Sequence, residues 1–345
     1  NIHVFQPSGT NRRVTWKSTL GDKSTEVFCV QFDPEDRYIA TGCGDGSIRV
    51  YNLLTGKLAY LMNEQKVSRP EEAKKMPTTA IRWRPTGGTM RTKNLLISVQ
   101  ADGSVAHWHT TSGKNLHRLH DEFNELKCID FRVDGMQFAT AGKDMMIRIY
   151  DETTKQLVHA VPDNGGVGHS NRIFSVKYDT EDPNILISGG WDNTVQIWDI
   201  RTASSIRNIF GPYLCGDALD IKAGMILTGS WRPQDQVQIY SMSTGQIHHT
   251  VNWDGGVGLR QAPQPCLVYG AQYSKHDQGE VILAGGSRSN EARLFDTLNY
   301  DKPFAAIMDL PGPVYSVDFS HNGQMFALGC GDGTIRVFNI SKWGC

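Results

Sequence analysis

Residues 43–52 read CGDGSIRVYN, and residues 330–339 read CGDGTIRVFN. Each copy joins a Gly/Asp turn to a short segment in which apolar and polar residues alternate, as they do in a strand with one buried face. The two copies stand too far apart for a local turn motif. The chain therefore repeats a structural unit, and the same pattern recurs between the two ends.

The alternating segment occurs seven times and ends in an aromatic residue each time. The copies are SIRVY (47–51), SVAHW (104–108), MIRIY (146–150), TVQIW (194–198), QVQIY (236–240), EARLF (291–295) and TIRVF (334–338). Two further apolar segments precede a copy and one follows it, as in FCVQF (28–32), YIATG (38–42) and KLAYLM (57–62). Four short strands joined by Gly, Asp and Asn turns predict one antiparallel sheet per copy, which buries its faces against neighbouring copies.

The most complete copy is GHSNRIFSVKYDTEDPNILISGGWDNTVQIWDIR (168–201), with Gly-His at its start and Trp-Asp near its end. This pattern resembles the WD-repeat β-propellers, and the resemblance covers essentially the whole chain. It implies an all-β fold, a seven-bladed ring. In that family a loop His, a strand Ser/Thr, a turn Asp and a strand Trp form a buried hydrogen-bonded tetrad. The resemblance assigns these roles to His169, Ser188, Asp192 and Trp198.

The other copies depart from the full pattern. The first three keep the Ser/Thr–Asp pair but have no His at the matching position, the fifth and sixth lose the turn Asp, and the seventh has Leu328 where Ser or Thr is expected. The sequence therefore predicts one complete tetrad and six blades held together by packing.

The two ends of the chain predict how the ring closes. The seventh copy supplies three strands (about 313–339), and a spare strand, RRVTWKSTL (12–20), precedes the first copy. The N-terminal strand is therefore expected to complete the last blade, which leaves no wide sheet edge exposed. Residues 1–345 then form a single propeller with a charged loop insertion at 63–78. Because residue 1 is not Met, the chain is expected to be part of a longer protein or a processed one.

Composition narrows the class of protein. The net charge is −1, with 35 basic and 36 acidic residues, which gives no electrostatic reason to expect a nucleic acid or a membrane as partner. Seven cysteines without a C-x-x-C pair predict free thiols and neither disulfides nor a zinc site. The expected location is the cytoplasm, with the nucleus as an alternative.

No pattern of catalytic or cofactor-binding residues stands out, and we predict a protein that is not an enzyme and has no cofactor. A G-x-S-x-G nucleophile motif is absent. His107 and His109 share one face of a strand and could begin a metal site, but no acidic or thiolate ligands stand nearby in the sequence. GGVG at 165–168 and 255–258 lacks the helix and Lys of a phosphate cradle.

The resemblance also implies where a partner binds: on the ring face made by the loops before the first strand of each blade and by the turns between its second and third strands. The residues predicted there are Glu26, Phe28, Lys127, Lys143, Arg172, Phe174, Trp191, Tyr269, Arg288 and Tyr315. Aromatic rings beside arginine are typical of interaction hot spots. For Phe28 and Phe174 packing inside the pore is an equal alternative, whereas Trp191 is expected to be exposed.

Together these features predict a non-catalytic scaffold that binds a peptide or a loop of a partner protein, as one subunit of a multiprotein complex. Two alternatives remain open at this point. WDIR (198–201) resembles the box by which some WD-repeat proteins join cullin-type ubiquitin ligases as substrate receptors, with Asp199 and Arg201 as adaptor contacts. The other alternative is a structural subunit of a cytoskeletal or ciliary assembly.

Overall fold

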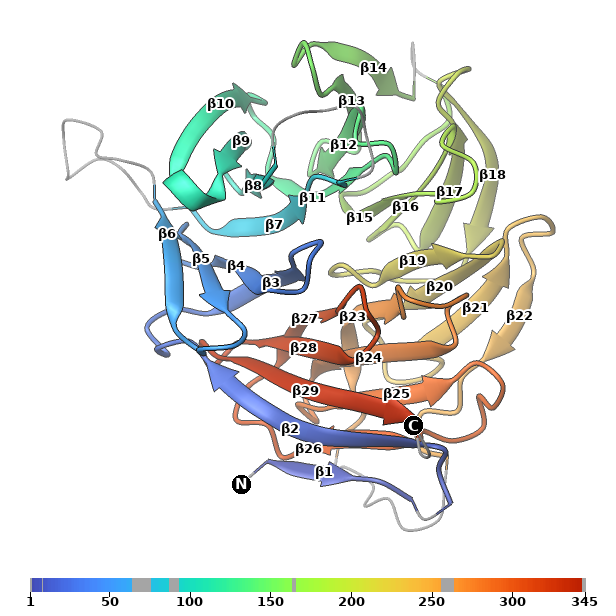
Figure 1. The fold of residues 1–345 in the computed structure, drawn as a ribbon. Helices are drawn as coiled ribbons and strands as arrows, with labels where there is room; N and C mark the ends of the chain where they lie inside the picture. The colour runs from blue at the N-terminus through green and yellow to red at the C-terminus, as the bar shows by residue number, and fades with distance from the viewer. Residues whose placement is uncertain are drawn as a thin grey trace.

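Each predicted repeat forms one antiparallel sheet in the computed structural model, which describes residues 2–7, 9–63, 76–86, 93–162, 166–255 and 264–342. Seven sheets surround a central axis as blades (Figure 1). The helical content of the described ranges is a single 3-10 turn, η1 (Thr110–Ser112). The all-β, seven-bladed propeller predicted from the repeats is confirmed.

The strands follow the chain from the first blade to the last. Blade 1 comprises β3 (Val27–Phe32), β4 (Tyr38–Cys43), β5 (Ile48–Asn52) and β6 (Leu58–Met62). Blade 2 comprises β7 (Thr78–Trp83), β8 (Leu95–Gln100), β9 (Ser104–His109) and β10 (Lys114–His120). Blade 3 comprises β11 (Leu126–Phe131), β12 (Gln137–Gly142), β13 (Ile147–Asp151) and β14 (Leu157–Val161). Blade 4 comprises β15 (Ile173–Tyr178), β16 (Ile185–Gly190), β17 (Thr194–Asp199) and β18 (Ser204–Phe210).

The last three blades follow the same plan. Blade 5 comprises β19 (Leu219–Lys222), β20 (Met225–Gly229), β21 (Val237–Ser241) and β22 (Ile247–Thr250). Blade 6 comprises β23 (Leu267–Tyr273), β24 (Val281–Ser287), β25 (Ala292–Asp296) and β26 (Ala305–Met308). Blade 7 comprises β27 (Val314–Phe319), β28 (Met325–Cys330) and β29 (Ile335–Lys342), together with β2 (Arg12–Leu20). The first strand of each blade contacts the first strand of the next, and β27 contacts β3, so the ring is closed.

The closure uses the N-terminal strand, as the sequence predicts. β2 pairs antiparallel with β29, with Val14 opposite Ile340 and Leu20 opposite Ile335. The two ends of the chain therefore share one blade, and β2 and β29 run side by side in Figure 1. Cys43 and Cys330 end equivalent strands of the neighbouring blades 1 and 7, which explains why the chain reads alike near its two ends.

One strand has no counterpart in the predicted pattern. β1 (His3–Phe5) pairs antiparallel with β26 and adds a fifth strand to blade 6. The segment is also fastened to β2, because the Gln6 side chain donates to the Arg12 carbonyl at 3.1 Å and accepts the Val14 N–H at 3.0 Å. The first 20 residues thus contribute to two blades.

Replacing Val14 by aspartate should open this seam. Val14 is 4% exposed and packs among the apolar residues shared by blades 6 and 7, so a carboxylate there would be buried without a partner. We expect the free energy of unfolding, measured by chemical denaturation, to fall by at least about 3 kcal/mol. Lys17→Asp, on the exposed side of the same strand, should change it by no more than about 0.5 kcal/mol. Equal losses in both variants would contradict the prediction.

The apolar core lies between blades. Phe32 and Ile39 of blade 1 are fully buried against Ala327 and Val337 of blade 7, and equivalent clusters fill the other junctions. Because neighbouring strand residues point to opposite faces, each blade gives one apolar face to the blade before it and one to the blade after it. This explains why the alternating pattern recurs in all seven copies.

Polar side chains join the innermost strands around the axis. A side chain near the end of such a strand accepts the N–H of the last residue of the innermost strand in the next blade. The acceptor–donor pairs are Asp130–Tyr178, Asp220–Tyr273, Gln272–Phe319 and Asp318–Phe32, at 2.9, 2.8, 3.1 and 2.8 Å. These bonds link the innermost strands of consecutive blades along the wall of the central channel.

The turn aspartates shape the tight turns between the second and third strands. Asp45 accepts the N–H of Ser47 at 3.0 Å, and Gly46 between them has a positive φ of 79°. Asp102, Asp144, Asp192 and Asp332 accept the same bond in blades 2, 3, 4 and 7. Blades 5 and 6, which lack this Asp, make the connection with the different turns at 230–236 and 288–291.

Candidate protein-interaction site

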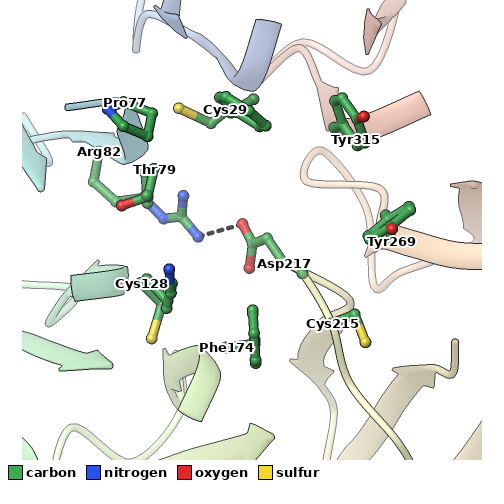
Figure 2. A pocket seen from close by; sticks show the side chains of 14 residues that line it. Cys29, Pro77, Thr79, Arg82, Cys128, Phe174, Cys215, Asp217, Tyr269 and Tyr315 are labelled. Carbon is green, nitrogen blue, oxygen red and sulfur yellow. Dashed lines mark hydrogen bonds and ion pairs between the residues drawn. The ribbon is translucent and has the colours of Figure 1, made fainter. Parts of the chain in front are cut away.

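The predicted partner-binding face surrounds one mouth of the central channel, here called the upper mouth. A cavity of about 370 Å³ opens there and is lined by residues of blades 1 to 7. The walls carry the aromatic rings of Phe28, Phe174, Tyr269 and Tyr315, and Figure 2 shows Tyr269 and Tyr315 on one side of the hollow and Phe174 apart from them. The inner strands supply the ring-bearing positions because their first residues stand nearest this mouth.

A row of rings covers the side of the upper mouth formed by blades 1, 7 and 6. Phe28 stacks on Tyr315 with ring centroids 5.3 Å apart, and Tyr315 meets Tyr269 edge to face at 5.4 Å. Trp231 continues the row at 6.2 Å from Tyr269. Phe28, Tyr269 and Tyr315 are half-buried: each packs on a neighbouring ring and also lines the cavity. Phe28 and Phe174 thus pack against neighbouring rings and also line the cavity.

A second aromatic group lies on the blade 4 side. Trp191 stacks on Phe174 at 5.0 Å and on Tyr213 at 6.3 Å, and its Nε1–H donates to the Cys215 sulfur at 2.9 Å. The Arg172 guanidinium lies over the same indole, 4.9 Å from the ring centroid. Trp191 is thus half-buried within a stack, whereas the sequence favours full exposure. Tyr213 comes from the irregular segment before β19, which carries no repeat signal.

The floor of the cavity is an ion pair that crosses the channel (Figure 2). Arg82 of β7 reaches from blade 2 to Asp217, which precedes β19 in blade 5, with Nη2 and Oδ2 2.6 Å apart. Its Nε also pairs with Asp130 at 3.1 Å. The second Asp217 oxygen accepts a bond from Ser175 at 2.9 Å and lies 3.5 Å from the Lys177 ammonium. Two cations and two anions therefore give the floor no net charge.

This cluster fixes the protonation state of the floor. Burial alone would raise the pKa of Asp217, but Arg82 and Lys177 hold it well below its usual range. The pKa of the Cys29 thiol beside the cavity is shifted in the other direction, because burial raises it to about 12. Burial likewise raises the pKa of Cys215 to about 11. Both cysteines are therefore neutral thiols at pH 7 and are poor nucleophiles and metal ligands.

A second cavity of about 360 Å³ opens at the opposite mouth and shares Arg82 with the first. Its lining contains several lysines and aspartates, including Lys177, Lys222, Lys275 and Asp220, beside the rings of Phe131, Tyr178 and Tyr273. The Arg82 cluster thus separates two chambers of different chemistry. The aromatic chamber faces the predicted side of the ring.

The charged residues predicted for the upper mouth differ in what they contact. Lys127 and Lys143 both pair with Glu125, at 3.3 and 2.8 Å. Glu26 is exposed beside Phe28, and Arg288 is exposed on the turn between β24 and β25. The sequence does not single out Arg82 as a functional residue, because its aspartate partners are 48 and 135 positions away.

The four residues assigned to the tetrad lie together in blade 4. His169 contacts Asp192 through Nδ1 at 2.8 Å and Ser188 through Nε2 at 2.7 Å, and Trp198 donates to Ser188 at 2.8 Å. Blade 2 keeps the last of these bonds, because Trp108 donates to Ser98 at 3.0 Å. The tetrad links the loop before blade 4 to two of its strands and so supports Arg172 and Phe174, which follow that loop.

The residues considered for other functions are separated from the upper mouth. Asp199 and Arg201 pair with each other, with Nη2 and Oδ2 2.7 Å apart, at the opposite end of the third strand of blade 4. His107 is fully buried and contacts Glu152 at 3.0 Å, whereas His109 contacts Ser112 at 2.8 Å. Within the described ranges no three His, Cys, Asp or Glu side chains gather as metal ligands.

Some sequence features fall where nothing is described. Residues 64–75 of the charged insertion lie outside the described residues, as do the first residue of the first GGVG segment and the last three of the second. For the described part of the chain, no helix has the length and the apolar character needed to cross a lipid bilayer.

Comparison with known families agrees with this geometry. The WD domain, G-beta repeat family matches residues 15–52, 113–151, 164–199 and 306–339. The matches fall on blades 1, 3, 4 and 7, and the remaining blades repeat the same strand order. The chain thus contains WD repeats and folds as a seven-bladed β-propeller.

Individual relatives are distant. The chain is 26% identical to the serine-threonine kinase receptor-associated protein of Gallus gallus, over 70% of this chain and 62% of that protein. It is 23% identical to the ribosome biogenesis protein WDR12 homolog of Drosophila virilis, over 89% of this chain and 70% of the relative. It is 21% identical to the periodic tryptophan protein 2 homolog of Dictyostelium discoideum, of which it covers 24%. The chain spans less than two thirds of the receptor-associated relatives, so their activities are not transferred to it.

Proposed function

We propose that this propeller is a non-catalytic interaction scaffold that binds a peptide or a loop of a partner protein over the upper mouth. The observation that carries the proposal is the cavity of about 370 Å³ with four half-buried aromatic rings in its walls. Concave, largely apolar sites with a few placed polar groups are typical binding sites. The rings are already packed on one another, which reduces the ordering cost of binding.

The relatives support an interaction role. One is named for its association with a kinase receptor and another for ribosome biogenesis, and both names describe proteins that work with other macromolecules. The neutral thiols and the fully paired floor of the cavity supply no activated nucleophile. We therefore propose a subunit of a cytoplasmic multiprotein complex in which the ring displays side chains and performs no reaction.

The double substitution Tyr269→Ala and Tyr315→Ala tests this assignment. It removes two adjoining rings from the cavity wall, and hot-spot aromatics of this kind contribute about 2 kcal/mol or more to binding. Affinity purification with quantitative mass spectrometry should recover the partner of the wild-type protein at least about tenfold less well with the double variant. Trp16→Ala removes an exposed aromatic from the outer strand β2 and serves as the control.

The outcomes separate the upper mouth from the rest of the ring. Partner recovery that falls with Tyr269→Ala/Tyr315→Ala and persists with Trp16→Ala supports the proposal. Recovery that persists with the double variant would move the site to the sides or to the opposite mouth, as in the alternative of a structural subunit. Thermal unfolding of both variants shows whether any loss comes from misfolding instead.

A further inference from the structure

The chemistry of the partner can be inferred from the way Arg172 is held. Its guanidinium lies 4.9 Å from the centroid of the Trp191 ring. Trp191 is itself fixed between Phe174 and Tyr213, and its N–H is bonded to Cys215. When a guanidinium lies over an aromatic ring, its N–H groups point outward in the guanidinium plane. They therefore remain available as hydrogen-bond donors.

Arg172 also differs from neighbouring cations in having no anionic partner among the described residues. Lys127 and Lys143 pair with Glu125, and Arg82 pairs with two aspartates. Among the described residues, the Arg172 guanidinium interacts only with the indole. A preorganised guanidinium with unused donors matches the two oxygens of a carboxylate, with which it forms two parallel hydrogen bonds. Phosphate sites are usually built from clusters of arginines, and within the described ranges no second arginine stacks on Trp191.

The arginine is connected to the cavity through shared residues. Phe174 stacks on Trp191 with one part of its surface and lines the cavity, and Cys215 likewise contacts Trp191 and lines the cavity. A partner residue bound to Arg172 would therefore place its chain neighbours over the opening. The cavity volume of about 370 Å³ suits one large side chain.

The cavity favours an uncharged side chain. Its walls carry rings, thiols and Ala80. The charged groups that line it are already paired, because Lys127 contacts Glu125 and Arg82 contacts Asp217. A charged side chain would lose its hydration without gaining an unpaired counter-ion. An aromatic or large aliphatic side chain has no charge to desolvate, and it gains contact with the rings of the cavity wall.

We infer that the upper mouth recognises an acidic–apolar peptide, in which an Asp or Glu carboxylate pairs with Arg172 while a nearby aromatic or large aliphatic side chain enters the cavity. This inference rests on the proposed function and adds the partner's chemistry to it. Each half of the motif has its own contact surface, so each half can be removed separately.

A library of random 12-residue peptides displayed on phage tests the inference. The library is selected on the wild-type protein and depleted on the Tyr269→Ala/Tyr315→Ala variant, which removes peptides that bind elsewhere. The expected result is enrichment of peptides with Asp or Glu a few residues from Phe, Trp, Tyr, Leu or Met. Enriched sequences are then synthesised, and their Kd values are measured with purified protein.

Arg172→Gln should weaken these peptides by about 10- to 100-fold, because it removes a charge-assisted, bidentate hydrogen bond. Arg172→Lys keeps the positive charge but cannot form two parallel hydrogen bonds with a carboxylate. Its Kd for these peptides should therefore lie between the values of the wild type and of Arg172→Gln. Lys17→Gln makes the same change of charge on the exposed side of the outer strand β2, away from the upper mouth, and should leave Kd within about threefold. A double-mutant cycle combines Arg172→Gln with peptides in which Asp or Glu is replaced by Asn or Gln. The affinity of these amide peptides should not fall further when Arg172 is changed to Gln.

The outcomes distinguish this inference from the proposed function. Enriched peptides that lack acids, carry Lys or Arg in their place, or bind Arg172→Gln as tightly as the wild type would overturn the inference and leave the upper mouth as a binding site. No enrichment over the depletion variant would overturn the proposed function, and the inference with it. An unchanged melting temperature for Arg172→Gln excludes unfolding as the cause of weaker binding.

Discussion

Arg82→Met is expected to lower the free energy of unfolding by about 3–5 kcal/mol at pH 7, because it removes the cation that two carboxylates in the channel share. Arg82 bonds both Asp130 and Asp217 and is 7% exposed, so water cannot replace it fully. Asp130 is on blade 3 and Asp217 precedes blade 5, so the loss should appear in the unfolding of the whole ring. Chemical denaturation followed by tryptophan fluorescence measures it.

Lys143→Met removes a cation from an exposed pair with Glu125 and serves as the control, with an expected change within about 0.5–1 kcal/mol. Adding Asp217→Asn to Arg82→Met should restore part of the stability, since one of the two carboxylate charges is gone and Ser175 can still donate to the side-chain oxygen. An Arg82→Met variant as stable as the wild type would mean that the pair across the channel contributes no net stability.

The same pair predicts a pH dependence with a definite sign. Despite its burial, the carboxyl of Asp217 has a pKa well below its usual range because of Arg82 and Lys177. A carboxyl with a lowered folded-state pKa contributes stability above its unfolded-state pKa of about 3.9 and loses it as the pH falls further. The difference in stability between wild type and Arg82→Met should therefore be largest at neutral pH and shrink below about pH 4.

Ser188→Ala should be the second large effect, with a loss of about 2–4 kcal/mol in the free energy of unfolding. The hydroxyl is fully buried and joins His169 to Trp198, so its removal leaves two buried polar nitrogens without this partner. Urea unfolding measures the loss, and near-ultraviolet circular dichroism reports whether the Trp198 environment has changed.

Thr228→Ala is the matched control in blade 5, because that buried hydroxyl makes one bond, to the Gln238 carbonyl at 3.1 Å. Its expected cost is about 1 kcal/mol. Blade 7 illustrates the reason for the difference, since Leu328 and Phe338 replace the Ser and Trp together and leave no polar group to satisfy. Equal losses in Ser188→Ala and Thr228→Ala would contradict a special role for the tetrad.

The repeat made most of the fold predictable. Residues 12–20 and the seven alternating segments mark strands that the structure contains, since a period of two determines which face of each strand is buried. The gathering of Phe28, Tyr269 and Tyr315 at one mouth also follows from their equivalent positions in the repeat. These features depend on local patterns copied from blade to blade.

Features that break the repeat could not be predicted in this way. The pair between Arg82 and Asp217 joins residues 135 positions apart across the axis, and nothing in either segment signals the other. Tyr213 lies in an irregular connection, so its stacking on Trp191, and the partial burial that results, had no sequence signal. β1 is too short for a period to be recognised.

The shared last blade has a consequence for synthesis. β2 emerges among the first residues of this sequence and pairs with β29, which is completed only at Lys342. During translation the early strand must wait without its partner while six other blades form, and the closing contact carries a large loop-closure cost. Stalled or nicked chains that lack the C-terminal segment would therefore expose two unpaired strand edges at once, which makes them natural substrates for chaperones and proteases.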